Sequence, residues 1–373
     1  MNIIFAAGGT GGHINPALSV AGELKRRNPE TGIMFIGTAD KLEARLVPQA
    51  GYEFGTIEIS GFKRYFNLQG IKENLLTVKR LMRVTGQVEK IFDRFKPDIV
   101  MGFGGYVSGP VVRYAAKKGI PTAIHEQNAY PGVANKALSN RVDSVMLTAV
   151  QAQKLLKCKN PPVLTGLPVR PEFLSTNKDF SRAELGIEDD KILIVSSGGS
   201  LGARAVNEAV LELILKMHDD SRFVFIHGTG QNGLWFKDRM REAGVEPDSL
   251  KNVRITEYID NMAQTMSAAD IVISRAGASS LTEIEALGAA SILIPSPNVT
   301  ENHQYHNAMA LVNESAAVLI EESELNADIL AGQVRRLADN AVLRRSLGEN
   351  AKKLSKPHAE KTICDILEKL AEK

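Results

Sequence analysis

Three glycine-rich segments hold the residues whose types and spacing suit chemistry on a phosphate or a sugar. They span residues 8–13, 102–109 and 198–202, and each follows an apolar run typical of a buried strand. Glycine admits positive φ angles, which bring backbone N–H groups close to a ligand, and the N-terminus of a following helix favours an anion. Three such loops predict a diphosphate ligand, although one loop alone is often only a tight strand-to-helix turn.

The first of these loops ends with a histidine, His13. The loop does not match the dinucleotide-binding fingerprint, because Ile14 stands where the third glycine is required, and it lacks the Gly-Lys-Ser/Thr sequence of a P-loop. Its position after a strand puts it at the edge where open α/β sheets bind ligands. We therefore expect this loop and His13 to face a ligand rather than only to pack.

Two further polar segments follow predicted strands. In the segment from His125 to Asn128, the amides can bond sugar hydroxyls. His125 and Glu126 suit a functional role and a structural one equally, because buried polar pairs often only satisfy loop backbone. Residues 274–283 open another helix, in which Glu283 either accepts hydrogen bonds from two ribose hydroxyls or belongs to a capping box.

The elements that must position these residues alternate between strand and helix. Runs such as residues 99–101 are apolar on both faces, which indicates parallel strands covered by helices on two sides. After a proline-rich stretch the same order of strand, glycine loop and helix begins again, so we predict two similar α/β domains. The strands predicted in the first half are residues 3–7, 33–37, 98–102, 122–125 and 142–147, and the second half restarts with the strand 192–195. The predicted domains are residues 1–166 and 167–352, with a helix in 353–373 that packs back on the first.

Composition excludes several other classes of protein. With 373 residues the chain exceeds the usual size of a domain with a single core. Its formal net charge of +2 does not indicate whether its partners are acidic or neutral. Cys158 and Cys364 match no metal-ligand spacing and suit a reducing compartment, so we expect no metal site and a cytoplasmic protein. A serine nucleophile elbow and an apolar stretch long enough to span a membrane are both absent from the sequence.

Residues 63–83 carry a local excess of positive charge among apolar side chains. Such a segment can dock on an anionic lipid surface, with its apolar side chains in the interface. An ordinary helix with one buried apolar face and one solvated basic face explains the same residues, and composition alone favours this interpretation. Nucleic acid is a third candidate, which no reading motif supports. The proposed membrane-facing residues are Lys63, Arg64, Leu75, Lys79, Arg80 and Arg83.

Taken together, these motifs resemble the MurG family of bacterial N-acetylglucosaminyltransferases, nearly from end to end. The resemblance is carried by residues 8–13, 104–110, 125–128, 168–170, 198–200, 304–305 and 307–308. It implies a GT-B architecture, in which two Rossmann-like domains with mostly parallel sheets face a central cleft. The implied reaction is an inverting transfer of N-acetylglucosamine from UDP-N-acetylglucosamine to the C4 hydroxyl of lipid I. The product, a β-1,4-linked lipid II, serves peptidoglycan synthesis and hence cell-wall growth and division.

The resemblance also implies roles for single residues. His13 is the expected base, with Glu126 as the second catalytic candidate. Glu283 would hold ribose, Gln304 the sugar hydroxyls, Ser200 the donor's phosphate and the backbone near Ile259 the uracil. The first loop would then face the acceptor's pyrophosphate and the donor's sugar. The implied donor-site residues are Thr10, Gly11, Gly12, Asn128, Arg170, Ser200, Ile259, Ala278, Ser279, Ser280, Leu281, Thr282, Glu283 and Gln304. The implied acceptor-site residues are Gly104, Gly105, Tyr106 and His125.

The implied partners are UDP-N-acetylglucosamine, lipid I, anionic phospholipid and other cell-wall synthesis proteins, at the cytoplasmic face of the membrane and without a cofactor. The chain departs from the family pattern at Leu167, Leu201 and His303, which affects details of phosphate and sugar contacts. Another GT-B enzyme acting on a UDP-sugar, such as a 2-epimerase or a lipid glycosyltransferase, would share the donor contacts and is the alternative. A further alternative is a scaffold protein that binds the nucleotide without catalysis.

Overall fold

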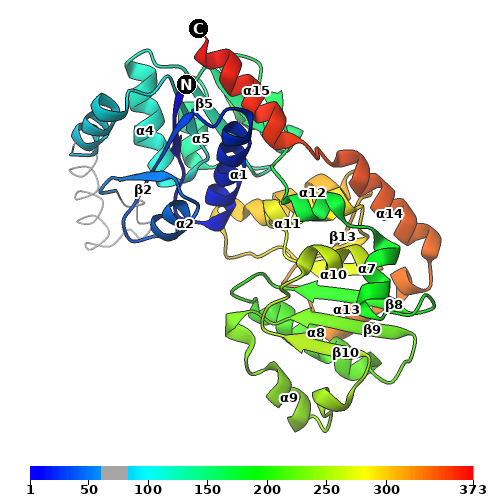
Figure 1. The fold of residues 1–373 in the computed structure, drawn as a ribbon. Helices are drawn as coiled ribbons and strands as arrows, with labels where there is room; N and C mark the ends of the chain where they lie inside the picture. Colours follow the sequence, from blue (N-terminus) through cyan, green and yellow to red (C-terminus); the bar gives the residue numbers. More distant parts are fainter. Residues whose placement is uncertain (60–82, 373) are drawn as a thin grey trace. The chain divides into compact units, whose positions relative to one another are not determined.

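The chain folds into two compact α/β units, each built around one sheet (Figure 1). The computed structural model describes residues 1–59 and 83–372. The first unit comprises Met1–Pro168 together with the C-terminal residues from His358 onward, and the second comprises Val169–Pro357. The divisions after Pro168 and Pro357 lie two and five residues beyond the positions expected from sequence.

In the described part of the first unit, the sheet has seven strands in the order β3-β2-β1-β4-β5-β6-β7, all parallel. The strands are β1 (Asn2–Ala6), β2 (Gly32–Gly37), β3 (Glu53–Thr56), β4 (Ile99–Gly102), β5 (Thr122–Glu126), β6 (Ser144–Leu147) and β7 (Val163–Leu164). The helices are α1 (Gly11–Arg27), α2 (Glu43–Gln49), the helical residues 83–95, α4 (Gly105–Lys117), α5 (Val133–Leu138), the 3-10 helix η1 (Val150–Leu155) and α15 (Ala359–Ala371).

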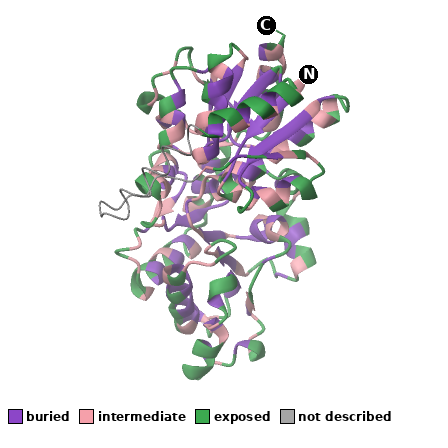
Figure 2. Ribbon diagram, turned by 90° about the vertical axis from the view of Figure 1, so that its left-hand side faces the viewer, coloured by how far each residue is buried: buried purple, intermediate pink, exposed green. Residues whose placement is uncertain are grey.

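Successive residues of β1 enter different cores, which explains why the strand is apolar from Ile3 to Ala6. Ile3 and Phe5 pack with α1 and α15 on one face of the sheet. Ile4 and Ala6 pack with α4 and the helical residues 83–95 on the other. All four side chains are fully buried, as alternation in a strand covered on both faces requires. Figure 2 shows the same burial along the strands of both units.

The C-terminal helix α15 packs on α1 and completes the first unit (Figure 1). Its buried residues Ile363, Leu367 and Leu370 recur at helical spacing and form one apolar face. At the edge of this contact, Nη1 of Arg27 donates to Asp365 and Glu368 at 2.6 and 2.7 Å. The last helix therefore stabilises a unit whose other residues lie some 200 positions earlier in the chain.

The second unit repeats this plan with six parallel strands in the order β10-β9-β8-β11-β12-β13. Its strands are β8 (Ile192–Ser197), β9 (Phe223–Gly228), β10 (Val253–Thr256), β11 (Ile271–Ser274), β12 (Ser291–Leu293) and β13 (Val318–Leu319). Its helices are α6 (Pro171–Ser175), α7 (Lys178–Leu185), α8 (Arg204–Met217), α9 (Phe236–Glu242), α10 (Met262–Ala268), α11 (Ala278–Leu287), α12 (His303–Val312), α13 (Ala327–Ala338) and α14 (Ala341–Leu354). The 3-10 helices η2 (Gln231–Gly233), η3 (Pro247–Ser249) and η4 (Thr300–Asn302) lie in its loops.

The repetition of the plan extends to one polar contact. The carboxylate of Asp98, just before β4, accepts a hydrogen bond of 2.6 Å from the backbone N–H of Asn2 in β1. In the second unit Asp270, just before β11, accepts one of 2.9 Å from the N–H of Leu193 in β8. Both aspartates thus fix the start of the strand that comes first in the sequence of their sheet.

The predicted fold class and the parallel sheets are confirmed, and the predicted strands are present with ends shifted by one or two residues. The strands β3 and β7 of the first unit were not predicted, nor were β9, β10, β12 and β13 of the second. Among the described residues, no helix has the length and apolar character needed to cross a membrane. The same residues contain no group of three or more His, Cys, Asp or Glu side chains that could hold a metal ion.

Candidate active site

A buried carboxylate fixes the glycine loop between β1 and α1. Glu43, the first residue of α2, is fully buried and accepts hydrogen bonds from Gly9 N at 3.0 Å and from Thr38 N and Oγ1 at 3.1 and 2.9 Å. Gly9 has a φ angle of +91°, and a Cβ on Gly8 would lie 2.8 Å from Glu43 Oε1. The loop therefore needs glycine at both positions. The sequence did not reveal Glu43, because a single glutamate outside any motif gives no signal.

This arrangement changes what the first loop can bind. Because the N–H of Gly9 already donates to Glu43, it is not available to a phosphate. A buried carboxylate behind the loop also disfavours a second anion there. The N–H of Gly9 therefore adds no donor for the acceptor's pyrophosphate, which we expected at this loop.

His13 lies in the first turn of α1 and is partly buried. Its Nδ1 is 3.1 Å from the carbonyl oxygen of Gly8 and 3.2 Å from Oγ1 of Thr10. A carbonyl oxygen can only accept, so Nδ1 carries the hydrogen and Nε2 is the unprotonated nitrogen of the neutral ring. That nitrogen is the one with which a histidine takes up a proton.

The loop between β4 and α4 contacts the first loop. Gly104 and Gly105 have φ angles of +92° and +73°, and a Cβ on Gly104 would lie 3.1 Å from the ring of His13. The hydroxyl of Ser108 donates to Ala6 O at 2.7 Å and accepts from Gly104 N at 3.0 Å, which ties the loop to β1. A Cβ placed on Gly9 would be 3.6 Å from the ring of Tyr106. The structure thus brings Gly104, Gly105 and Tyr106 together with His13.

His125 lies inside the first unit, with no exposed surface. Its Nε2 is 2.8 Å from Gly166 O, its Nδ1 is 3.3 Å from Gln127 Nε2, and its ring stacks on Phe103. Burial lowers the pKa of His125 to about 4, so the ring is neutral at physiological pH. We expected His125 to contact the acceptor, whereas the structure gives it the role of fixing the end of β5 and the following loop.

Glu126 is also buried, with 1% of its surface exposed. Its carboxylate accepts hydrogen bonds from the backbone N–H groups of Asn128 and Gly132 and from Nδ2 of Asn135, at 2.8–3.0 Å. Burial raises the pKa of Glu126, against the opposing effect of these donors. The sequence left function and structure equally open for Glu126. These contacts favour structure, since the carboxylate shapes the loop that holds the partly exposed Asn128.

In the second unit, Arg170 and Glu283 form an ion pair. Both Nε and Nη2 of Arg170 lie 2.9 Å from Oε1 of Glu283, and the guanidinium packs on the ring of Phe173. The Glu283 side chain is 14% exposed and that of Arg170 46%. Burial raises the pKa of Glu283, and the neighbouring guanidinium offsets part of this effect. Glu283 lies in the second turn of α11, whose N-cap is Gly277, so the capping-box alternative does not apply.

The glycine loop between β8 and α8 is more open than its counterpart in the first unit. Gly199 and Gly202 have φ angles of +92° and +78°, and Ser200 is exposed. The turn after β9 supports the loop, because Asn207 Nδ2 donates to Thr229 O at 2.8 Å. This loop leads into the N-terminus of α8, where backbone N–H groups favour an anion.

The remaining predicted donor residues follow the other strands of this sheet. Ile259, after β10, is buried and packs against Gly228, which has no Cβ to obstruct it. Ser279 is exposed at the start of α11, whereas Leu281 and Thr282 are buried. Gln304, on α12, accepts a hydrogen bond of 2.9 Å from Ser296 N. In a parallel sheet these loops share the carboxyl edge, so the second unit brings its predicted donor residues to one edge.

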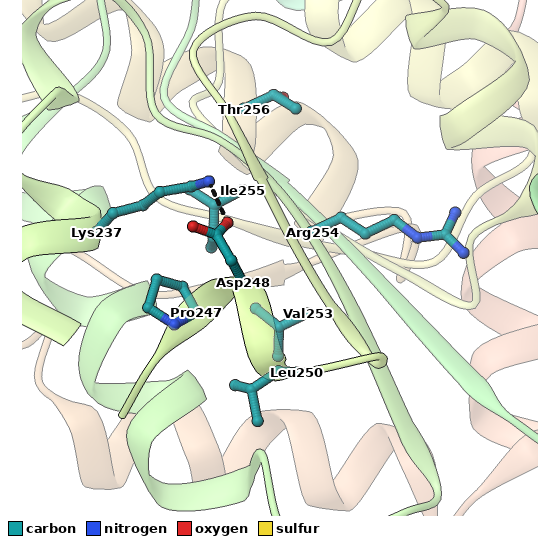
Figure 3. A pocket seen from close by; sticks show the side chains of 8 residues that line it. All are labelled: Lys237, Pro247, Asp248, Leu250, Val253, Arg254, Ile255 and Thr256. Atoms are coloured by element: carbon teal, nitrogen blue, oxygen red, sulfur yellow. Dashed lines mark hydrogen bonds and ion pairs between the residues drawn. The ribbon is translucent and has the colours of Figure 1, made fainter. Parts of the chain in front are cut away.

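A separate surface depression of about 230 Å³ lies at the edge strand β10 of the second unit (Figure 3). Its lining includes the ion pair of Lys237 and Asp248, 2.7 Å long, and the strand residues Val253 to Thr256. None of the predicted site residues lines it. We assign it no part in the site.

The proposed membrane-facing residues are only partly covered by the structure. Lys63, Arg64, Leu75, Lys79 and Arg80 lie outside the described residues. Arg83 is exposed at the first described position of the helical residues 83–95.

The chain has two α/β units, each with a sheet of parallel strands and glycine-rich loops at the carboxyl edge of that sheet. This is a glycosyltransferase fold of the GT-B type. The model of the glycosyltransferase family 28 N-terminal domain matches residues 3–147, and that of the C-terminal domain matches residues 192–363. The chain therefore belongs to glycosyltransferase family 28, and its assignment as a hexosyltransferase is confirmed.

Curated relatives and solved structures cover almost the whole chain. A relative from Acetivibrio thermocellus is 43% identical over 98% of this chain and 97% of its own length. One from Desulforamulus reducens is 40% identical over 99% of each. Both are named UDP-N-acetylglucosamine–N-acetylmuramyl-(pentapeptide) pyrophosphoryl-undecaprenol N-acetylglucosamine transferase. The crystal structure of Acinetobacter baumannii MurG has a TM-score of 0.81 at 27% identity, covering 99% of both chains. The resemblance inferred from the motifs is thus confirmed.

Proposed function

We propose that this enzyme transfers N-acetylglucosamine from UDP-N-acetylglucosamine to the C4 hydroxyl of lipid I, with inversion, to give lipid II and UDP. The observation that carries this proposal is the full-length similarity to transferases named for that reaction. The geometry of the two sheet edges supports a role for each predicted residue.

The second unit binds the donor. The carboxylate of Glu283, held by Arg170, accepts hydrogen bonds from the ribose hydroxyls. The exposed Ser200 and the backbone N–H groups at the start of α8 bind the diphosphate, and the backbone at Ile259 binds uracil. Gln304 bonds the sugar hydroxyls, in an orientation supported by its contact with Ser296 N. The start of α11, residues 278–282, lies beside the nucleotide.

The first unit binds the acceptor and supplies the base. Nε2 of His13 takes the proton of the C4 hydroxyl while its oxygen forms a bond to the anomeric carbon of the donor. The bond from that carbon to the diphosphate oxygen breaks, and its electron pair leaves with UDP. General-base help of this kind is typically worth about 10²- to 10⁴-fold in rate. Gly104, Gly105 and Tyr106, which adjoin His13, contact the acceptor, and Thr10, Gly11, Gly12 and Asn128 contact the donor sugar.

Charge on the departing UDP is stabilised by protein dipoles. The N-terminus of α8 and the N–H groups of its glycine loop are already oriented, so they need not reorganise during the reaction. We propose that these groups are sufficient and that the enzyme uses no cofactor beyond its two substrates.

The enzyme works as a peripheral protein at the cytoplasmic face of the membrane, because its acceptor is anchored there by a lipid. The basic and apolar residues 63–83, of which Arg83 is described and exposed, contact anionic phospholipid. Other cell-wall synthesis proteins that use the product are its expected partners.

One assay tests the reaction. Purified enzyme is incubated with a lipid I analogue and labelled UDP-N-acetylglucosamine in the presence of EDTA, and the products are separated. Label in a β-1,4-linked disaccharide with equimolar UDP is the expected result. Label in an epimerised UDP-sugar would instead identify a 2-epimerase, and nucleotide-sugar binding without UDP release would identify a binding scaffold.

A further inference from the structure

One peptide group in the first glycine loop is hydrogen-bonded from both ends. The N–H of Gly9 donates to Oε2 of Glu43 at 3.0 Å. The C=O of Gly8, which belongs to the same peptide group, lies 3.1 Å from Nδ1 of His13. A buried carboxylate, one peptide group and the imidazole of His13 therefore form a continuous hydrogen-bonded chain.

We propose that Glu43 is a positioning residue for catalysis, which acts on His13 through the peptide group between Gly8 and Gly9. This inference rests on the proposed function, in which His13 is the base. It resembles the role of a carboxylate that contacts a catalytic histidine directly, with a peptide group inserted between the two. Glu43 itself does not touch the substrate.

The physical basis is the polarisation of the peptide group. A carboxylate that accepts from an N–H increases the negative charge on the carbonyl oxygen of the same peptide, and hydrogen bonds in a chain strengthen one another. The stronger acceptor at Gly8 O holds the hydrogen on Nδ1 and stabilises the imidazolium that forms when Nε2 takes a proton. The proton taken from the acceptor hydroxyl remains on Nε2 until it is released to solvent.

The surroundings of Glu43 support this role over simple packing. Its carboxylate is fully buried, and three donors hold both of its oxygens in place. A Cβ on Gly37 would lie 2.5 Å from Glu43 Cγ, so the preceding strand end is shaped to admit this side chain. The burial of a carboxylate requires such compensation, and here it is provided by groups of the glycine loop and its neighbour.

Among the described residues, titratable groups near these hydrogen bonds come from the loop before α2 and from α4. Lys41, in the loop before α2, pairs with Asp40 at 3.1 Å. Its charge interacts with Glu43 and with Tyr106 of α4, which adjoins the loop. These groups stay unchanged when Glu43 is substituted, so a change in His13 reports on Glu43.

The test is a nitrogen NMR titration of His13 in the whole protein labelled at histidine. His13→Gln assigns the His13 signal among the seven histidines. In the unsubstituted protein we expect the neutral ring to carry its hydrogen on Nδ1. In Glu43→Gln we expect the pKa of His13 to fall by about one pH unit, because a buried negative charge has been removed nearby. The acid limb of kcat/KM should move to lower pH by the same amount, with a lower plateau because the base is weaker.

Asp98→Asn is the matched control, since it also removes a carboxylate that accepts from a backbone N–H of the first unit, at the opposite end of β1. In this variant the pKa of His13 should be unchanged. A hydrogen on Nε2 in the unsubstituted protein would overturn the proposal even if Glu43→Gln fails to fold. An unchanged His13 pKa in folded Glu43→Gln would also overturn it. The titration is independent of turnover, so it separates this inference from the role of His13 as base, which kcat of His13→Gln tests.

Discussion

The pair of Arg170 and Glu283 predicts a specific pH dependence of donor binding. Glu283 is 14% exposed, and its burial raises its pKa, so the carboxylate loses its charge as the pH falls through a value above the ordinary one. The positive charge of Arg170 acts in the opposite direction and lowers the pKa of Glu283. Two unit charges about 4 Å apart at an effective dielectric constant of about 20 attract by about 4 kcal/mol. Because the Arg170 side chain is 46% exposed, solvent screening reduces this toward about 1 kcal/mol, or about 0.7 pH unit.

Substituting Arg170→Met should therefore raise the midpoint of the pH dependence by about 0.7 unit. Below the midpoint, a protonated Glu283 bonds the ribose through a neutral group, which should weaken binding by about 1 kcal/mol, or roughly fivefold in Kd. Calorimetric titration with UDP-N-acetylglucosamine between about pH 5 and 8 measures this change. This ligand is suitable because both of its phosphates are esterified and do not titrate in that range.

Glu283→Gln is the control, since it keeps the shape of the side chain and removes its titration. Its Kd should not vary across the range and should stay near the weaker value that the unsubstituted enzyme reaches below the midpoint. Identical pH profiles in Arg170→Met and the unsubstituted enzyme would refute the reasoning, because the ion pair would then have no effect on the carboxylate. A flat profile in the unsubstituted enzyme would show that Glu283 does not contact the donor as an anion.

Three further outcomes follow from other parts of the molecule. His13→Ala should lower kcat by about 10²- to 10⁴-fold while the Kd of UDP-N-acetylglucosamine is kept, and near-normal kcat would remove His13 as the base. The enzyme should sediment with anionic vesicles in a manner that weakens with added salt, and equal binding to neutral vesicles would count against residues 63–83 as an electrostatic contact. Leu367→Ala, in the fully buried face of α15, should reduce the free energy of unfolding by about 2–5 kcal/mol in urea titrations. A loss below about 1 kcal/mol would show that α15 adds little to the first unit.

The fold could be predicted because its main signal is local. Strands such as β1 and β4 lie between two layers of helices, so their buried residues on both faces are apolar and the run is visible in the sequence. The strands β3 and β7 lie at the two edges of their sheet. Both are short: β3 has the sequence Glu-Phe-Gly-Thr and β7 consists of one Val and one Leu, so neither produces a long apolar run. Their presence depends on pairing with a neighbour that lies elsewhere in the sequence.

The site was predictable where a motif carries its own geometry and not where it depends on a distant partner. Glycine loops and His13 are recognisable, because positive φ angles require glycine at fixed positions. Glu43 is some 30 residues from the loop it holds, at the start of a short helix, and no local pattern marks it. The cluster from His125 to Asn128 looks uniformly polar in sequence, and only the structure shows that its first three members are buried.

The two units show how one scaffold can serve two kinds of ligand. Both place a glycine loop between the first strand of the sheet in chain order and the helix that follows it. In the first unit the N–H of Gly9 is bonded to the buried carboxylate of Glu43, which leaves the loop suited to a neutral sugar and to the orientation of His13. In the second unit the N–H of Gly199 donates to the neutral Oγ of Ser197, at 3.2 Å, and the loop adds no buried negative charge through that contact. We therefore propose that a diphosphate binds at the glycine loop of the second unit and not at residues 8–13, although both loops have the same glycine-rich appearance in the sequence.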